Sequence, residues 1–338
     1  MKQILIINRM NTDNFGDRII TKSMTNLFND KNIRVKHADY IFSPEIPFEK
    51  YSWTKRATRY LKKIVYKLFC IKEVSKSDAV IFGGGELIAS NGIFFSSFIQ
   101  WNKIIKAVNK NCKCFLFSVG VTGDFSEKQK GKLNQYLMDY KGIYVRDFGS
   151  QKKLSDLTNE NPTKVDFTPD CVFSLCCEQT KSEDKLLLGI TSLFRHNKQK
   201  KIKFDTETDL FDWYLLKLNE MRTNETVEVI YNDNQDKKIA KQFIKYAHSK
   251  GYKFRKLVEI KDEEQFIKLL STAKKIISPR MHACILGIIL GKEVVPVIFS
   301  EKMYNFQQMY CNKHTDLTSI ASNINESAED IITKVLKD

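Results

Sequence analysis

The chain has 338 residues, of which 42% are hydrophobic and 28% are charged, and its formal net charge is +15. This length predicts two domains, and the composition excludes a disordered chain and a collagen-like fibre. The positive surplus bears on partners rather than on the fold. The longest apolar run, residues 283–291, is much shorter than the roughly 20 residues of a membrane-spanning helix.

Eight cysteines are present, and none of them forms a C-x-x-C pair. Most lie in apolar stretches, where a thiol behaves as a small hydrophobic group. The first apolar residues, 4–7, lead directly into Asn8 and Arg9, so they are too few for the core of a signal peptide. We therefore expect a reduced, cytoplasmic protein without structural disulfides and without a metal site.

Short apolar runs alternate with helical periodicity through the first half of the chain. The expected strands are 4–8, 33–36, 79–82, 114–119, 143–145 and 164–167, and the expected helices are 18–29, 93–108, 126–140 and 150–157. Strands of about five residues that alternate with helices predict a parallel sheet with right-handed crossovers.

A polar stretch without periodicity, 176–185, indicates a linker, and a second alternating set follows it. Its expected strands are 186–191, 226–231, 253–257, 275–278 and 294–297, and its helices are 209–221, 235–249, 262–272, 281–290 and 326–336. We predict an α/β fold with two Rossmann-like doubly wound domains that face a cleft, in a glycosyltransferase-B-like arrangement. The predicted parts are an N-terminal domain (1–177), a C-terminal domain (186–315) and a helical tail (316–338).

Ligands of such sheets bind beyond the carboxyl ends of the strands, so the strand-end loops are the candidate site. The loop after the first strand holds Asn14 and Asp17. Asp13 or Asn14 is suited to cap the next helix, whose N-terminus would then form an anion or hydroxyl site. The alternative is a plain strand-to-helix turn. Asp17 either stabilises the helix dipole or faces a substrate.

Three consecutive glycines, Gly83 to Gly85, follow the third expected strand in a chain that has only 14 glycines. Glycine lets a ligand approach the backbone closely. The run lacks the spacing of dinucleotide-binding folds, and no Walker lysine follows it, which argues against nicotinamide cofactors and P-loop chemistry. The alternative role is purely steric, in packing a helix against the strand.

Two further loops carry arginines. Arg146 leaves a buried strand and either serves an anion or forms a structural ion pair, for which Asp147 is the nearest candidate. In the segment 276–284, Ser278 suits an N-cap and Pro279 the first helical position. Arg280 and His282 are then expected in the first turn, which predicts an anion site at the start of a buried helix.

In their order and spacing, these loops resemble the polysaccharide pyruvyl transferase family. The resemblance covers about residues 5–310, and its elements are Asn14-Phe15-Gly16-Asp17, Asp78 with Val80–Gly85, Val145-Arg146-Asp147, Pro169–Phe173, Arg280-Met281-His282, Gly291, Pro296 and Lys302. It implies transfer of the pyruvyl group of phosphoenolpyruvate to two hydroxyls of a sugar in a surface-polysaccharide or lipid-linked precursor, which yields a cyclic ketal and phosphate. Phosphoenolpyruvate is the co-substrate, and no further cofactor is implied.

The resemblance also implies roles for individual residues. The C-terminal domain would bind phosphoenolpyruvate, whose carboxylate and phosphate call for cations and helix amides, and the N-terminal domain would bind the acceptor. His282 would act as general acid or phosphate partner, while Asp17 and Glu86 stay open as the base. The implied donor residues are Arg280, Arg146 and Lys302, and the implied acceptor residues are Asn14, Gly84 and Gly85. Arg195 is a further donor candidate, because it leaves the first strand of the second domain and is placed to reach the cleft.

About half of the net charge comes from one segment, 50–72, which holds eight basic residues and no acidic one. Its apolar residues recur at helical spacing, so it predicts a basic amphipathic helix of the kind that lies on an anionic membrane. The alternative is an ordinary helix with a solvated basic face. Without a recognised nucleic-acid-binding module, we expect no nucleic-acid partner. The protein would be peripheral at the inner membrane face, close to a lipid-linked acceptor.

Two other functions fit parts of this pattern. A glycosyltransferase that uses a nucleotide sugar would have the same architecture, and it would bind a nucleoside diphosphate instead of phosphoenolpyruvate. A non-catalytic scaffold would use the basic helix to bind membranes, and no small ligand would stabilise it.

Overall fold

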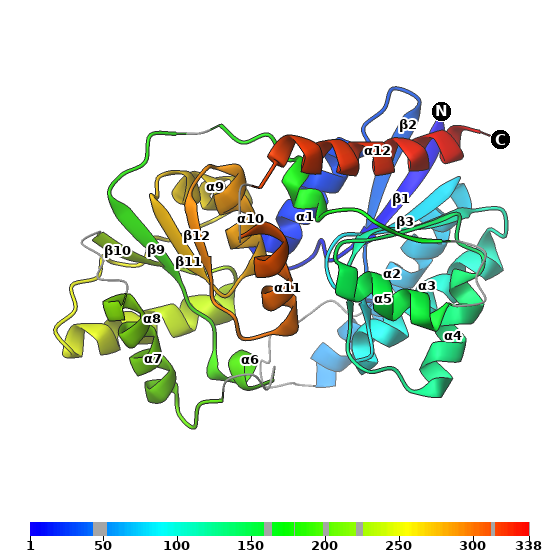
Figure 1. The fold of residues 1–338 in the computed structure, drawn as a ribbon. Helices are drawn as coiled ribbons and strands as arrows, with labels where there is room; N and C mark the ends of the chain where they lie inside the picture. Colours follow the sequence, from blue (N-terminus) through cyan, green and yellow to red (C-terminus); the bar gives the residue numbers. More distant parts are fainter. Residues whose placement is uncertain are drawn as a thin grey trace. The chain divides into compact units, whose positions relative to one another are not determined.

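The computed structural model describes residues 1–42, 53–158, 164–178, 180–198, 203–220, 226–311 and 315–337 (Figure 1). The chain forms two compact units. The first comprises Met1–Thr12, Asp17–Ser174 and Thr318–Asp338, and the second comprises Asp13–Gly16 and Leu175–Leu317. Both are α/β with parallel sheets, as predicted from the alternation of strands and helices.

The first unit is built on a six-stranded parallel sheet in the order β2-β1-β3-β5-β7-β8. The strands inside this sheet read as almost continuous apolar runs because helices cover both faces, whereas the edge strands β2 and β8 carry polar residues. The strands are β1 (Lys2–Asn8), β2 (Ile33–Asp39), β3 (Ala79–Gly83), β5 (Lys113–Val119), β7 (Gly142–Val145) and β8 (Val165–Phe167). The connecting helices are α1 (Phe15–Leu27), α2 (Trp53–Lys76), α3 (Gly92–Val108), α4 (Glu127–Leu137) and α5 (Phe148–Leu157).

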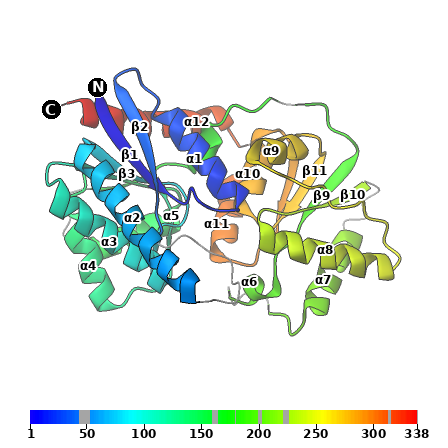
Figure 2. The same cartoon turned by 180° about the vertical axis from the view of Figure 1, so that it is seen from behind.

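Smaller elements complete this unit. Strands β4 (Ile88–Ala89) and β6 (Val121–Thr122) pair with each other, and a 3-10 turn spans Cys171–Ser174. The last helix, α12 (Leu317–Leu336), also belongs here, and Figure 2 shows the same elements from behind. The Tyr144 hydroxyl donates to the Asp330 carboxylate of α12, and the Lys113 ammonium donates to the Lys334 carbonyl (2.9 Å). The segment that the sequence set apart as a tail is therefore part of the first unit.

The second unit has a four-stranded parallel sheet in the order β10-β9-β11-β12. The strands are β9 (Lys185–Gly189), β10 (Thr226–Ile230), β11 (Lys275–Ser278) and β12 (Glu293–Pro296). The helices are α6 (Leu193–Lys198), α7 (Glu207–Glu220), α8 (Asn234–Ser249), α9 (Glu263–Ser271), α10 (Met281–Ile289) and α11 (Glu301–Tyr310). Helices α6 and α11 were not predicted. Helix α6 has only six residues, and α11 has ten, although its Met303, Phe306 and Tyr310 form a buried apolar stripe at helical spacing.

The strand predicted at 253–257 is wrong. This segment is irregular, and its backbone reaches β10 through a bond from Arg255 N to the Val227 carbonyl (3.3 Å). Phe254 is buried between exposed neighbours, and Phe254 and Leu257 are the two apolar residues on which the predicted strand rested. The Arg255 side chain pairs with Glu228 (2.8 Å) and holds the segment beside the sheet.

The strand orders show where, in each sheet, the chain stops adding strands on one side and starts adding them on the other. In the first sheet β1 lies between β2 and β3, and in the second β9 lies between β10 and β11. The connections on the two sides of such a strand lead away from it in opposite directions. Their separation opens a crevice at the carboxyl end of the strand. The loops that flank these positions contain Gly84 and Gly85 after β3, Thr191 after β9 and Arg280 after β11.

Candidate functional site

A cluster of two arginines and two aspartates lies at the strand ends of the second unit. Arg280 donates from Nε to Asp236 (2.8 Å) and from Nη2 to Asp233 (3.1 Å) and Asp236 (2.7 Å). Arg195, from α6, donates from Nη1 to Asp233 and Asp236, both at 2.8 Å. The two arginines are thus joined by the same two carboxylates, although they come from loops after different strands.

The two aspartates are buried more deeply than the arginines. Asp233 and Asp236 side chains are 5% and 0% exposed, against 28% for Arg195 and 20% for Arg280. Burial raises the pKa of Asp236, and the charge of Asp233 acts in the same direction, while Arg195 and the Thr191 hydroxyl lower it. The two guanidinium groups match the two carboxylates in formal charge, and both arginine side chains stay partly exposed to solvent.

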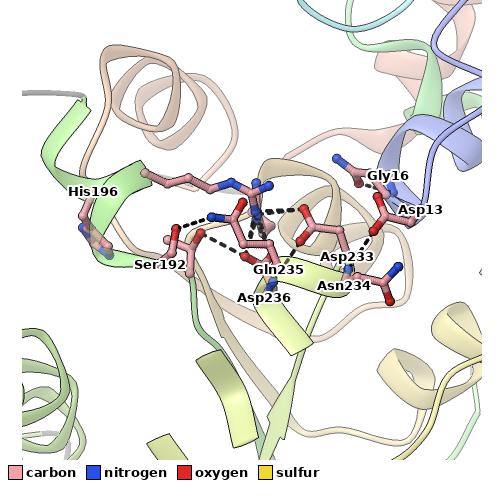
Figure 3. A network of polar contacts seen from close by, with 12 residues as sticks. Asp13, Gly16, Ser192, His196, Asp233, Asn234, Gln235 and Asp236 are labelled. Atoms are coloured by element: carbon pink, nitrogen blue, oxygen red, sulfur yellow. Dashed lines mark hydrogen bonds and ion pairs between the residues drawn. The ribbon is translucent and has the colours of Figure 1, made fainter. Parts of the chain in front are cut away.

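The aspartates are fixed by the start of helix α8 (Figure 3). Asp233 is the N-cap of α8 and accepts a hydrogen bond from Asp236 N (2.9 Å). Thr191, after β9, donates its hydroxyl to Asp236 (3.0 Å). The Gln235 amide donates to the Ser192 hydroxyl (3.1 Å). The loops after β9, β10 and β11 thereby form one connected network.

The segment Asp13–Gly16 packs against this network within the second unit. The Asp13 carboxylate accepts from Asn234 N (2.9 Å), at the positive end of α8 (Figure 3). Phe15 N donates to the Asn232 carbonyl (2.9 Å), and the Phe15 ring stacks on Phe266 with centroids 5.3 Å apart. The chain before α1 is therefore held by the second unit rather than left as a free turn.

His282 contacts the same segment. A Cβ added to Gly16 would lie 2.3 Å from His282 Nδ1, so glycine is needed for this close approach. His282 is buried in the first turn of α10. The Asn14 side chain accepts from Gly16 N (2.9 Å), which confirms the predicted cap of α1 by Asn14.

The start of α10 differs from the prediction. The helix begins at Met281, so Arg280 and not Ser278 occupies the N-cap position, and the Arg280 side chain makes no capping bond. Ser278 instead accepts from Arg280 N through its hydroxyl (3.0 Å), because Pro279 lies between them outside the helix. The guanidinium is therefore free to turn toward Asp233 and Asp236. Lys302 lies in the first turn of α11, after β12 at the same edge of the sheet.

In the first unit, Arg146 is bound in the interior. Its Nη1 donates to Asp170 (2.9 Å), both side chains are 3% exposed, and Glu86 lies 3.9 Å from Nη2. Burial alone would lower the pKa of Arg146, but the charges of Asp170 and Glu86 raise it overall. This supports the structural ion pair, although the partner is Asp170. Asp147 instead caps α5 by accepting from Ser150 N (2.8 Å).

The glycine run lies against α1. A Cβ on Gly83 would meet Met24 Cε at 2.1 Å, and one on Gly84 would meet Ile20 Cγ2 at 2.2 Å. Both residues thus have the steric role of letting a helix approach the strand end. Gly85 has a φ of +74° but more room, with Ile20 Cδ1 at 3.6 Å from an added Cβ. Asp17, in the first turn of α1, is placed to stabilise the helix dipole.

The sequence analysis missed Asp233 and Asp236. Their signal was the stretch Asn232-Asp233-Asn234-Gln235-Asp236, which directly follows an expected strand and holds two aspartates one helical turn apart. This stretch contains no glycine, arginine or histidine, so it does not stand out as a binding loop. Among the described residues, no group of three His, Cys, Asp or Glu side chains is arranged to hold a metal ion.

Comparison with known proteins identifies the family of the chain and the solved structures with a similar fold. The model of the polysaccharide pyruvyl transferase family matches residues 14–300. A search of curated proteins finds no match. Among solved structures, the chain is similar to the UDP-GlcNAc 2-epimerase from Neisseria meningitidis bound to UDP-GlcNAc, at 13% identity over the whole of both chains and a TM-score of 0.52.

The chain is also similar to the UDP-GlcNAc 2-epimerase from Methanocaldococcus jannaschii, at 12% identity over the whole of both chains and a TM-score of 0.56. S. aureus MnaA with UDP has 10% identity, with 99% of this chain and 96% of that chain covered and a TM-score of 0.53. At these identities the likeness shows the fold alone, and the fold is glycosyltransferase-B-like, as the order of elements predicted.

Proposed function

This chain belongs to the polysaccharide pyruvyl transferase family, and we propose that it moves the pyruvyl group of phosphoenolpyruvate onto two hydroxyls of a sugar in a surface-polysaccharide or lipid-linked precursor. The products are a cyclic ketal and phosphate. The observation that carries the proposal is the pair of arginines, Arg195 and Arg280, held by carboxylates at the reversal point of the second sheet.

Arg280 and Arg195 are the proposed donor residues. Among the described residues, Arg280 uses Nε and Nη2 on the aspartates, and Arg195 uses Nη1. The other edge of each guanidinium then remains for the carboxylate or phosphate of phosphoenolpyruvate, which a planar guanidinium binds well. The aspartates orient these edges before the ligand arrives, which lowers the entropy cost of binding. Lys302 would add a point charge from α11.

The chemistry requires two proton movements. One sugar hydroxyl adds to the central carbon of phosphoenolpyruvate while the methylene carbon gains a proton and becomes a methyl group. The bond to phosphate then breaks, and the second hydroxyl closes the ring. Of the two hydroxyl protons, one is balanced by the new methyl group and the other by the released phosphate. His282 is proposed as the group that supplies a proton to the carbon or the phosphate.

The acceptor side is assigned less specifically. Asp17 and Glu86 are the alternative bases for the hydroxyl, and Asn14 and Gly85 are proposed acceptor contacts. Gly84 is assigned to the packing of Ile20 instead, and Arg146 to its ion pair with Asp170. These assignments make Arg280 and His282 the centre of the proposed reaction.

Ligand binding distinguishes this function from a nucleotide-sugar glycosyltransferase. We expect phosphoenolpyruvate, and not UDP, to raise the thermal unfolding midpoint, since binding to the native state alone stabilises it. Phosphate release from phosphoenolpyruvate should require an acceptor, supplied as a panel of oligosaccharides and lipid-linked sugar extracts. Stabilisation by UDP without any effect of phosphoenolpyruvate would favour the glycosyltransferase and contradict the proposal.

A further inference from the structure

Helix α2 (Trp53–Lys76) has two apolar faces, and only one of them contributes to the core. Cys70 and Val74 are fully buried in the first unit. Five other apolar residues on the same helix are at least 40% exposed. One of them, Phe69 (41%), stacks on Tyr66, and the other four are Leu61 (59%), Ile64 (40%), Val65 (65%) and Leu68 (60%). Residues 50–52 of the predicted basic segment and the side chains before Leu61 lie outside the described part, so the case rests on residues 61–76.

These four residues form one stripe. They occupy positions i, i+3, i+4 and i+7, which lie along a single side of an α-helix. Single exposed apolar residues are common on protein surfaces, but a contiguous stripe is typical of an interaction site. We name Leu61, Ile64, Val65 and Leu68 the α2 stripe.

Lysines border the α2 stripe on both sides. Successive residues of an α-helix are about 100° apart. Lys62 therefore lies on one side of the stripe, next to Leu61, and Lys67 lies on the other side, next to Leu68. Lys72, four residues after Leu68, continues the row of the stripe itself. All three are exposed. Between Leu61 and Lys76 the sequence holds a single acidic residue, Glu73.

We propose that the α2 stripe docks on the surface of an anionic lipid bilayer. Apolar side chains would enter the headgroup boundary, while the lysines at the margin would contact lipid phosphates through their extended side chains. A second copy of the chain is a poorer occupant, because it would bring the same positive charges face to face. Among the described residues no helix has the length and hydropathy to span a bilayer, so the contact is peripheral.

This docking goes beyond the proposed reaction, and it would hold the enzyme at the surface where a lipid-linked acceptor lies. The test uses the full chain with vesicles of phosphatidylcholine alone and with 30% phosphatidylglycerol, and measures binding by flotation. We expect binding only to the anionic vesicles, with an affinity that falls as salt is added.

Two variants separate the contributions. Lys62→Glu/Lys67→Glu should weaken binding about 30-fold or more, because each basic residue near the surface contributes about 1 kcal/mol and reversal adds repulsion. Leu61→Ser/Leu68→Ser should weaken it through lost apolar contact. The matched control is Lys128→Glu/Lys132→Glu on α4, which changes the net charge equally at two exposed lysines of the same unit.

Loss of binding in both α2 variants with normal binding of the control supports the docking surface. An equal loss of vesicle binding in the control would show that only the net charge matters and would overturn the proposed docking. Absence of vesicle binding by the unmodified protein would also overturn it. A dimer in sedimentation experiments that Leu61→Ser/Leu68→Ser dissociates, without vesicle binding, would assign the stripe to a second copy. Affinity for phosphoenolpyruvate should stay unchanged in every variant, which keeps this test independent of the reaction.

Discussion

Both units place an arginine beside an aspartate at the end of a parallel sheet, but the two pairs differ in exposure. Arg146 and Asp170 in the first unit are both 3% exposed. Arg195 and Arg280 in the second unit are 28% and 20% exposed over aspartates that are almost completely buried. A buried pair stabilises a fold only as an intact unit, whereas a half-exposed arginine on a fixed carboxylate keeps donors for a ligand. Exposure, rather than position in the sequence, therefore separates the structural arginine from the candidate binding arginines.

The largest expected effect concerns the first unit. Arg146→Met leaves Asp170 buried without its partner and should lower the free energy of unfolding by about 3–5 kcal/mol. Urea denaturation measures this loss, and Arg146→Met/Asp170→Leu should recover most of it. Lys164→Met removes an exposed pair with Asp166 and serves as control, with an effect below about 1 kcal/mol. If Arg146→Met lowers the free energy of unfolding by less than about 1 kcal/mol, the Arg146–Asp170 pair does not have the structural role that distinguishes it from the arginines of the second unit.

The second unit should weaken in acid through His196. Its ring is buried among aromatic residues that include Trp213 and Phe299, and burial lowers its pKa from 6.5 to about 4. The unfolded chain then binds a proton that the folded chain does not, so stability is complete above pH 6.5 and falls as pH decreases toward 4. The loss reaches about 3 kcal/mol at 1.36 kcal/mol per pH unit. The raised pKa of Asp236 acts in the opposite direction over the same range, so urea denaturation between about pH 4.5 and 7.5 compares the unmodified protein with His196→Phe. Equal slopes in the two proteins would exclude His196 as the cause.

Gly16→Ala tests the placement of His282. The added methyl group would overlap the imidazole, so either the ring or the Asp13–Gly16 segment must move. A displacement of about 1 Å can lower a catalytic rate by roughly 100-fold, and we expect a loss of that order in phosphate release. Gly92→Ala, where an added Cβ meets nothing within 4 Å, is the matched control. Normal activity of Gly16→Ala would exclude His282 from the reaction.

Asp233→Asn is expected to have the smallest effect. Asparagine caps helices as well as aspartate does, so α8 should remain intact. Asparagine can still accept from Arg195 and Arg280 but without the negative charge, and this weaker hold should reduce affinity for phosphoenolpyruvate about 10-fold, or roughly 1.4 kcal/mol. Asp262→Asn, at the cap of α9, provides the control. If calorimetry finds that Asp233→Asn and the unmodified protein bind phosphoenolpyruvate with equal affinity, Asp233 serves only to cap α8.

Local patterns in the sequence predicted much of the fold. The apolar runs located β1, β3, β5 and β11, because strands buried on both faces must be apolar throughout. The same reasoning failed at 253–257, where one buried side chain in an irregular segment imitated a strand. It also set α12 apart, since nothing local indicates that Tyr144 and Lys113 contact residues of a helix that lie 186 and 221 positions later.

The candidate site was predicted in part for a related reason. Arg280 and His282 stood out because polar residues at the start of a very apolar helix are unusual. Asp236 carries no such signal, since its role depends on a contact with a residue 44 positions away. The exposure that distinguishes Arg280 from Arg146 is likewise a property of tertiary packing.

Binding of phosphoenolpyruvate by Arg280 is the step on which the proposed reaction depends. Isothermal calorimetry of phosphoenolpyruvate with Arg280→Ala measures it directly, with Arg255→Ala as the control at an arginine of the same unit that is 55% exposed. Loss of charge-assisted hydrogen bonds worth about 1.5–3 kcal/mol predicts affinity weaker by roughly 10- to 100-fold in Arg280→Ala and unchanged in the control. Equal affinities in Arg280→Ala and the unmodified protein would contradict the account.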